Sequence, residues 1–320
     1  MDQEINRVAV VGAGYMGTGI LQVLALSGLH CTFADVDGPT AQAAHAACLD
    51  QASRFEGRGY FPAGSAERIE ANSDWSSRIA DAAADADLVI EAVSEREQVK
   101  RAVFAEVESA AREDAILATN TSSIPIADLA ATLRRPERFY GIHWFNPAQF
   151  LPSIEIIEGP RASASTTQRI IDVLRRAGRS PVVVADSAGF VANRLQFALF
   201  REAALMVEEG LTTPEKLDEV VRGSFGYRLP FFGPFAIADL AGLDVYAAVF
   251  EVLERTLGPR FSCPPGLSAL VDDGHLGVKT GHGYAEFTEA ERERMTDDRD
   301  RAYVAMAATL GSWRGSETPS

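Results

Sequence analysis

The sequence predicts an α/β fold, with a doubly wound sheet of parallel strands at the N-terminal end followed by an all-α domain. Between residues 5 and 186, short apolar runs rich in β-branched residues alternate with longer amphipathic stretches. This alternation is typical of βαβ units, whose strands are parallel. From residue 188 onward the apolar spacing becomes helical. A chain of 320 residues is long enough for two packed domains.

Seven strands are expected in the first domain. They cover residues 7–11, 31–34, 87–93, 115–119, 139–143, 154–158 and 181–185. The first is followed by a helical stretch at 18–27. The sequence therefore predicts an α/β domain over residues 1–187.

The second domain, residues 188–287, is expected to be mainly helical. Its first helix carries an apolar face to about residue 209 and is stopped by Gly210. Thr213 and Pro214 look like the N-cap and first turn of a helix that runs to about 221. A third helical stretch is expected at 238–257, and a short β-like run at 283–287. Residues 288–310 are predicted to form a charged helix and 311–320 a frayed tail, so that 288–320 is a separate terminal segment.

Net charge, apolar runs and cysteine content limit the classes of function that the chain could have. Forty-five acidic residues against thirty basic ones give a formal charge of −15, which disfavours a nucleic-acid or anionic-membrane partner. No apolar run reaches the roughly 18 residues of a spanning helix, and no basic, apolar leader is evident, so a cytoplasmic enzyme is expected. The cysteines, Cys31, Cys48 and Cys263, are odd in number and widely spaced, which predicts idle thiols and no metal site.

The strongest local motif lies at the end of the first expected strand. It reads Gly12-Ala13-Gly14-Tyr15-Met16-Gly17 and opens the following helix. Gly12 allows a tight turn, Gly14 allows the backbone to approach a pyrophosphate, and Gly17 lets the helix pack close to the strand.

Asp35 ends the next strand, about 20 residues on, where a carboxylate binds the adenosine ribose hydroxyls of a dinucleotide. The residues after it are Val36, Asp37 and Gly38, with no arginine for a 2′-phosphate. The motif therefore predicts a Rossmann-type domain that binds NAD. A turn-forming glycine cluster and a flavin-dinucleotide site are the alternatives.

His143 and Glu155 form a candidate catalytic pair. His143 ends the strand at 139–143, and Glu155 lies in an apolar run at 154–157. A neutral imidazole can take the proton from a substrate hydroxyl, and a carboxylate can fix its tautomer. From these residues alone, a histidine at a strand end is more often structural than a base, and Glu155 could face solvent from an alternating strand.

Over roughly residues 5–287 the chain resembles the 3-hydroxyacyl-CoA dehydrogenase family. The matching segments are the glycine motif; Ile-Glu-Ala-Val at 90–93 with Glu95 and Lys100; Asn-Thr-Ser-Ser at 120–123; His-Trp-Phe-Asn-Pro at 143–147; Ser-Ile-Glu at 153–155; Gly-Phe-Val-Ala-Asn-Arg at 189–194; and Lys-Thr-Gly-His-Gly-Tyr at 279–284.

The resemblance implies that His143 is the general base, that Glu155 orients it, and that Ser122 and Asn193 bind the reacting oxygen. It also places Glu95, Lys100, Asn120 and Asn146 near the nicotinamide half of the cofactor, with Tyr15 and Met16 in the dinucleotide loop. The alternatives are a turn-forming Ser122, an Asn193 that caps its own helix, and surface salt-bridge roles for Glu95 and Lys100.

The chain departs from the fatty-acid branch of the family in two places. Residues 41–59 carry only Arg54 and Arg58 where that branch has a lysine-rich helix that contacts CoA, and Pro152 replaces a lysine before Glu155. The proline resembles the branches that act on free acids, such as gulonate, carnitine and pyridine-carboxylate dehydrogenases.

The predicted function is therefore NAD-dependent interconversion of a 3-hydroxyacyl compound, a CoA or similar thioester, and its 3-oxo form. The alternative is a dehydrogenase of a free hydroxy carboxylic acid; a catalytically inactive NAD sensor is a third possibility. The resemblance implies a homodimer formed through the helical domain, and the apolar stretch at 229–237 suits either an interface or a core.

Overall fold

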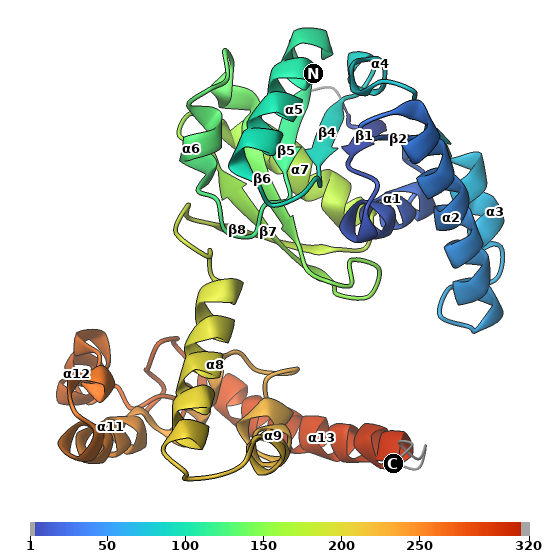
Figure 1. Cartoon of the computed structure of the whole chain (residues 1–320). Coiled ribbons are helices and arrows are strands. Elements are labelled where there is room, and N and C mark those ends of the chain that lie inside the picture. The colour runs from blue at the N-terminus through green and yellow to red at the C-terminus, as the bar shows by residue number, and fades with distance from the viewer. Residues whose placement is uncertain (1–3, 315–320) are drawn as a thin grey trace. The chain divides into compact units, whose positions relative to one another are not determined.

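The computed structural model describes residues 4–314 and divides into two compact units (Figure 1). The first unit ends at Phe200 and the second begins at Arg201. This division falls within a helix, so the predicted domain boundary at residue 187 stays a prediction. Among the residues described, no helix is both long enough and apolar enough to cross a membrane.

The first unit is built on one eight-stranded sheet. Its strands lie in the order β3-β2-β1-β4-β5-β6-β7-β8. Their bounds are β1 Arg7–Val11, β2 His30–Ala34, β3 Ser73–Trp75, β4 Leu88–Glu91, β5 Ile116–Thr119, β6 Phe139–Trp144, β7 Ser153–Glu158 and β8 Ser180–Val184. From β1 the chain adds strands first toward β3 and then, from β4 on, toward β8, which makes the sheet doubly wound.

The prediction of a doubly wound α/β domain is confirmed, with two corrections to the sheet. β3 was not expected, because a three-residue edge strand is too short for an apolar pattern to appear. The sheet is also not wholly parallel, since β7 runs antiparallel to β6. Only eight residues separate these two strands, too few for a helical crossover, so the chain must double back.

Helices cover both faces of the sheet (Figure 1). Core residues of α1 (Tyr15–Leu26), α2 (Gly38–Gly57), α3 (Ser65–Ala71) and α7 (Ala164–Arg176) pack with one face. Those of α4 (Ile79–Ala84), α5 (Glu97–Ala110) and α6 (Ile126–Ala130) pack with the other. The sheet is thereby buried between two layers, which explains why its strands read as continuous apolar runs.

The second unit is helical. Its helices are α8 (Ala192–Glu208), which begins in the first unit, α9 (Pro214–Gly223), α10 (Pro234–Ala241), α11 (Leu243–Leu257), α12 (Pro265–Asp272) and α13 (Glu289–Arg314). Thr213 caps α9 as predicted, accepting a hydrogen bond from the Lys216 amide. The buried core of the second unit is small and centres on Ala238, Leu243 and Leu267.

Three expectations for the C-terminal part were wrong in detail. The stretch expected as one helix at 238–257 is two helices, separated at Gly242, whose φ of 103° no helix accommodates. Residues 283–287 form no strand, and only isolated bridges occur here, which pair His282 with Gly277 and with Glu286. The charged helix continues to Arg314, past the expected start of a tail at 311, and residues 315–320 lie outside the described part.

Candidate active site

The candidate site lies at the carboxyl ends of the parallel strands. β1, β4, β5 and β6 are neighbours in the sheet and run in one direction, so their ends meet at one edge. Open α/β sheets bind ligands at this edge. The glycine loop follows β1 and Asp35 follows β2, while Glu95 and Ser122 follow β4 and β5. The remaining candidates lie on β6, β7, α5 and α8 or in the loops after β5 and β6.

The glycine loop has the shape that a dinucleotide requires. Gly12 has a φ of 101°, and a Cβ there would come within 2.7 Å of the Ala92 and Val93 backbone. At Gly17 a Cβ would lie 1.9 Å from the Gly12 carbonyl oxygen. Gly14, the N-cap of α1, has open space where a Cβ would point, and no side chain caps that helix end. The loop therefore leaves an uncapped helix N-terminus accessible to a pyrophosphate.

Tyr15 and Met16 form the first turn of α1, which begins three residues earlier than the sequence suggested. Tyr15 is exposed, whereas Met16 packs on the core. Asp35, at the end of β2, accepts hydrogen bonds from the amides of Ala13 and Val36, each at 2.7 Å. One carboxylate thus connects β2 to the glycine loop, and the loop and Asp35 together fit the adenosine and pyrophosphate of a dinucleotide.

His143 and Glu155 are brought together by the antiparallel pairing of β6 and β7, in which they are directly opposite each other. Nδ1 of His143 lies 2.8 Å from Oε2 of Glu155, and both side chains are almost fully buried. The alternative of a solvent-facing Glu155 is therefore excluded. Since Nδ1 contacts a carboxylate, this nitrogen carries the hydrogen, and Nε2 of a neutral ring is free to accept a proton.

Glu155 is itself fixed by backbone donors. Its Oε1 accepts hydrogen bonds from the amides of Val191 (3.0 Å) and Ala192 (2.9 Å), at the start of α8. The ring of His143 packs against Phe145 and Phe190, with centroid distances of 4.7 and 5.5 Å. The imidazole is therefore restrained both by a hydrogen bond and by aromatic contacts, as a positioned base requires.

Ser122 and Asn193 are in contact. The Asn193 side-chain amide donates to the Ser122 carbonyl oxygen at 3.0 Å. Asn193 therefore binds the loop after β5, and in this structure it does not cap its own helix. Ser122 is half-buried, and its hydroxyl lies 3.4 Å from Glu95.

Asn120 and Asn146 are placed differently. The side-chain oxygen of Asn120 accepts from the Trp144 amide at 2.9 Å and so joins the ends of β5 and β6. Asn146 is exposed and makes no hydrogen bond with any residue the structure describes, which leaves its side chain open to a ligand.

Glu95 and Lys100 form an ion pair that is only partly at the surface, because Lys100 is buried. Lys100 is buried on α5 and contacts both Glu95 (3.2 Å) and Glu91 (2.8 Å). Burial acts to raise the pKa of Glu95, but hydrogen bonds from Thr121 and the charge of Lys100 outweigh it and lower the pKa to about 2. Glu95 is therefore ionised at any physiological pH.

Glu91 was not identified from the sequence as a site residue. It is fully buried at the end of β4, and burial raises its pKa against the opposing charge of Lys100. A signal was available, because a glutamate ends an otherwise apolar strand nine residues before a lysine. The strand was expected to extend to residue 93, which concealed that Glu91 stands at its carboxyl end.

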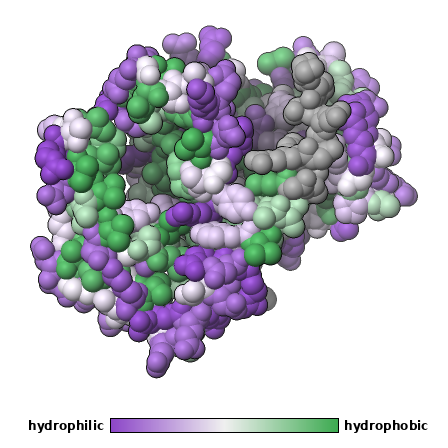
Figure 2. Space-filling view, turned by 90° about the horizontal axis from the view of Figure 1, so that it is seen from below, coloured by the Kyte–Doolittle hydropathy of each residue, from purple (hydrophilic) through white to green (hydrophobic). Residues whose placement is uncertain are grey.

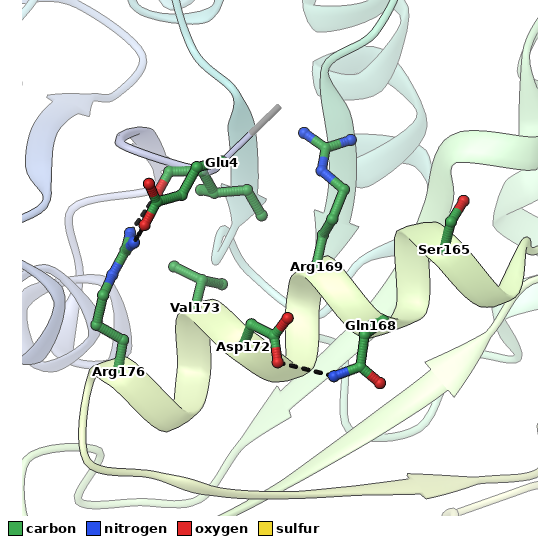
Figure 3. A pocket seen from close by; sticks show the side chains of 8 residues that line it. Glu4, Ser165, Gln168, Arg169, Asp172, Val173 and Arg176 are labelled. Atoms are coloured by element: carbon green, nitrogen blue, oxygen red, sulfur yellow. Dashed lines mark hydrogen bonds and ion pairs between the residues drawn. The ribbon is translucent and has the colours of Figure 1, made fainter. Parts of the chain in front are cut away.

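A cavity of about 550 Å³ elsewhere in the first unit does not belong to this site (Figure 3). It lies between α7 and the segment before β1, where Arg176 pairs with Glu4 and Gln168 donates to Asp172. That is the amino end of β1, opposite the edge where the glycine loop lies.

In the described part of the chain no group of three or more His, Cys, Asp or Glu side chains could hold a metal ion. Burial raises the pKa of the Cys31 thiol, and that of Cys48 to about 12, so both are protonated and unreactive. The predicted idle character of these two thiols agrees with the structure.

Comparison with known proteins identifies the family. Residues 7–187 match the NAD-binding domain of 3-hydroxyacyl-CoA dehydrogenase, and residues 189–287 match its C-terminal domain. The chain is 35% identical to a 5-formyl-3-hydroxy-2-methylpyridine 4-carboxylate 5-dehydrogenase of Mesorhizobium japonicum, over 96% of this chain and 98% of that one. It is also 35% identical to a probable 3-hydroxybutyryl-CoA dehydrogenase of Bacillus subtilis, over 89% and 99% of the two chains.

Similarity to solved structures supports the same family. A 3-hydroxyacyl-CoA dehydrogenase from Archaeoglobus fulgidus is 30% identical, with a TM-score of 0.80 and coverage of 95% of this chain and 99% of that one. The glycine loop and Asp35 fit the cofactor that the matched N-terminal domain binds. The chain belongs to the 3-hydroxyacyl-CoA dehydrogenase family, and it is an oxidoreductase that uses NAD.

Proposed function

We propose that this enzyme catalyses the reversible oxidation of a 3-hydroxyacyl thioester, such as a 3-hydroxyacyl-CoA, to its 3-oxo form. The observation that carries the proposal is the buried His143–Glu155 pair, whose Nδ1–Oε2 distance of 2.8 Å leaves Nε2 available as a base. The pair lies at the same sheet edge as the glycine loop.

In the proposed mechanism, Nε2 of His143 takes the proton of the substrate hydroxyl. Glu155 keeps the ring in the right tautomer and stabilises the imidazolium that forms. Because two backbone amides already hold Glu155, it needs no reorganisation when the charge appears. When bound, NAD accepts the hydride that leaves the substrate carbon.

Ser122 and Asn193 are proposed to hold the reacting oxygen as it changes from alcohol to ketone. The Asn193 side-chain amide donates to the Ser122 backbone carbonyl oxygen, so the two residues lie beside each other. Gly12, Gly14, Tyr15, Met16, Gly17 and Asp35 would hold the adenosine and pyrophosphate half of NAD, and Glu95, Lys100, Asn120 and Asn146 the nicotinamide half.

A free hydroxy carboxylic acid is the second candidate substrate. Arg54, one of only two cations at 41–59, is already paired with Asp50. Few positive charges on α2 are therefore left for the phosphates of CoA. The relative from Mesorhizobium japonicum is named for a pyridine carboxylate, which also supports this candidate.

The test follows NADH absorbance with the purified protein, NAD and matched substrates: 3-hydroxybutyryl-CoA against 3-hydroxybutyrate, gulonate and carnitine. Turnover of the thioester with the free acids inactive supports the first candidate. Turnover of a free acid alone overturns it in favour of the second. Absence of NADH with every compound would contradict both.

We also propose that the chain forms a homodimer through its helical part. Helix α8 has no buried residue among those described, although many of its side chains are apolar. Apolar side chains are left at the surface in the space-filling view (Figure 2). In α8 and α11 they include Leu195, Phe197, Phe200, Val245, Val249 and Val252. Exposed apolar area of this kind is typical of an interface.

A further inference from the structure

A series of charged contacts connects the buried end of β4 to the loop that carries Ser122. Glu91 accepts hydrogen bonds from Lys100 (2.8 Å), from the Thr119 hydroxyl (2.6 Å) and from the Val93 amide (2.7 Å). Its side chain is fully buried, and that of Lys100 is 1% exposed. The pair is therefore held rigidly between β4, β5 and α5.

Lys100 extends this series to Glu95. Its ammonium lies 3.2 Å from Glu95 Oε2 while it also contacts Glu91. The other carboxylate oxygen, Oε1, is thereby turned toward residues 121–123. Without Lys100, the half-exposed Glu95 would have no cation among the described residues to fix its direction.

Glu95 accepts several hydrogen bonds from the loop at residues 121–123. Its Oε1 accepts from the hydroxyls of Thr121 (2.5 Å) and Ser123 (3.0 Å) and from the amides of Ser122 (2.9 Å) and Ser123 (3.1 Å). One ionised oxygen therefore organises three successive residues. Charge-assisted hydrogen bonds of this kind are the stronger ones and fix a loop's geometry.

We propose that Glu91 is a positioning residue, which acts through Lys100 and Glu95 to hold the loop at 121–123 in the shape that presents Ser122 to the substrate. Glu91 touches neither substrate nor cofactor in this account. The inference rests on the proposed function in one respect, the role of Ser122 in holding the reacting oxygen.

The first test measures amide hydrogen exchange in the protein without ligands. Glu91→Gln keeps the side-chain shape but removes the charge that faces Lys100. We expect exchange at the Ser122 and Ser123 amides to rise about tenfold while the sheet amides stay protected. Unchanged exchange at these two amides would overturn the proposal.

Glu108→Gln is the matched control. Glu108 also lies on α5, is also nearly buried and is also ion-paired, but it accepts from the amides of Arg134 and Arg135. Glu108→Gln should raise hydrogen exchange at the Arg134 and Arg135 amides and leave exchange at residues 121–123 unchanged. If Glu91→Gln fails to fold, Glu91→Gln combined with Lys100→Met removes both buried charges and should loosen the same loop.

The second test is a double-mutant cycle on kcat. If Glu91 acts through Ser122, Glu91→Gln should lower kcat about tenfold in the wild-type background and less than about twofold in a Ser122→Ala background. Equal losses in both backgrounds would show that Glu91 does not act through Ser122. If the wild-type enzyme oxidised no hydroxy compound, the proposed function would fail, and amide exchange would still decide the positioning role.

Discussion

At the scale of single residues, Asp35 combines two tasks. Its carboxylate accepts a hydrogen bond from the Ala13 amide within the glycine loop, and we propose that it also binds the ribose hydroxyls of NAD. A 2′-phosphate would meet the same negative charge. Cofactor preference should therefore depend on this one side chain.

We predict that Asp35→Ala raises the KM for NAD on the order of tenfold and increases the relative use of NADP, because the repulsive carboxylate is gone. Steady-state kinetics with each cofactor measures this. Asp37→Ala is the control, since Asp37 only caps α2 by accepting from Thr40. An unchanged NAD to NADP preference in Asp35→Ala would remove Asp35 from the site.

The sequence indicated His143 and Asp35 because each is a polar residue at the end of an expected strand, and Glu155 because it is a carboxylate within an apolar run. The antiparallel pairing of β6 and β7 then placed His143 and Glu155 opposite each other. Glu91 also ends a strand but was missed, because that strand was expected to extend to residue 93. The hydrogen bonds that Lys100 makes with Glu91, and those that Glu95 makes with the loop after β5, were not predictable. Such contacts depend on how helix α5 packs on the sheet, which apolar spacing does not encode.

At the scale of elements, the junction of β1 and α1 depends on glycines for two different reasons. Gly17 is required by packing, because a Cβ would collide with the Gly12 carbonyl oxygen at 1.9 Å. Gly14 has open space around it, so packing does not require a glycine there, and we propose that its missing side chain leaves room for the pyrophosphate.

We predict that Gly17→Ala lowers the free energy of unfolding by about 1–3 kcal/mol, the usual cost of overpacking. Gly14→Ala should change it by less than about 1 kcal/mol and still weaken NADH binding, because its methyl group enters the space left for the pyrophosphate. Denaturant unfolding and NADH fluorescence titration separate the two effects. Equal losses of stability in both variants would contradict this distinction.

The stabilisation that Glu95 provides by connecting Lys100 of α5 to the loop after β5 should depend on pH in the acid range. The pKa of Glu95 is lowered to about 2 from an ordinary 4.5, so its ionised form stabilises the folded state above pH 4.5. This contribution is lost as the pH falls from 4.5 toward 2. We predict that wild-type stability declines more steeply over this range than that of Glu95→Gln, as measured by thermal unfolding at several pH values. Parallel curves would contradict it.

Most elements were predictable because their apolar patterns are long. The failures have local causes: β3 has only three residues, and the positive φ of Gly242 divides one apolar helical pattern into two helices. The antiparallel β7 could have been inferred from its short connection to β6.

At the scale of the whole molecule, the proposed homodimer would cover exposed apolar side chains of α8 and α11. We predict that light scattering after gel filtration gives a mass of about twice the 34.4 kDa of one chain. Phe200→Asp combined with Val249→Asp should shift the mass toward one chain, since charges in an apolar interface are costly. A mass of 34.4 kDa for the wild-type protein would contradict the proposed dimer.

The most direct test of the account is the turnover of His143→Ala with the substrate that the wild-type enzyme oxidises. Removing the base should lower kcat on the order of 10²- to 10⁴-fold and leave NADH affinity within about twofold. His45→Ala is the matched control and should keep full turnover. His45 lies on α2 and contacts Ser73 on β3, away from the proposed chemistry. A His143→Ala enzyme as active as the wild type would contradict the proposed mechanism.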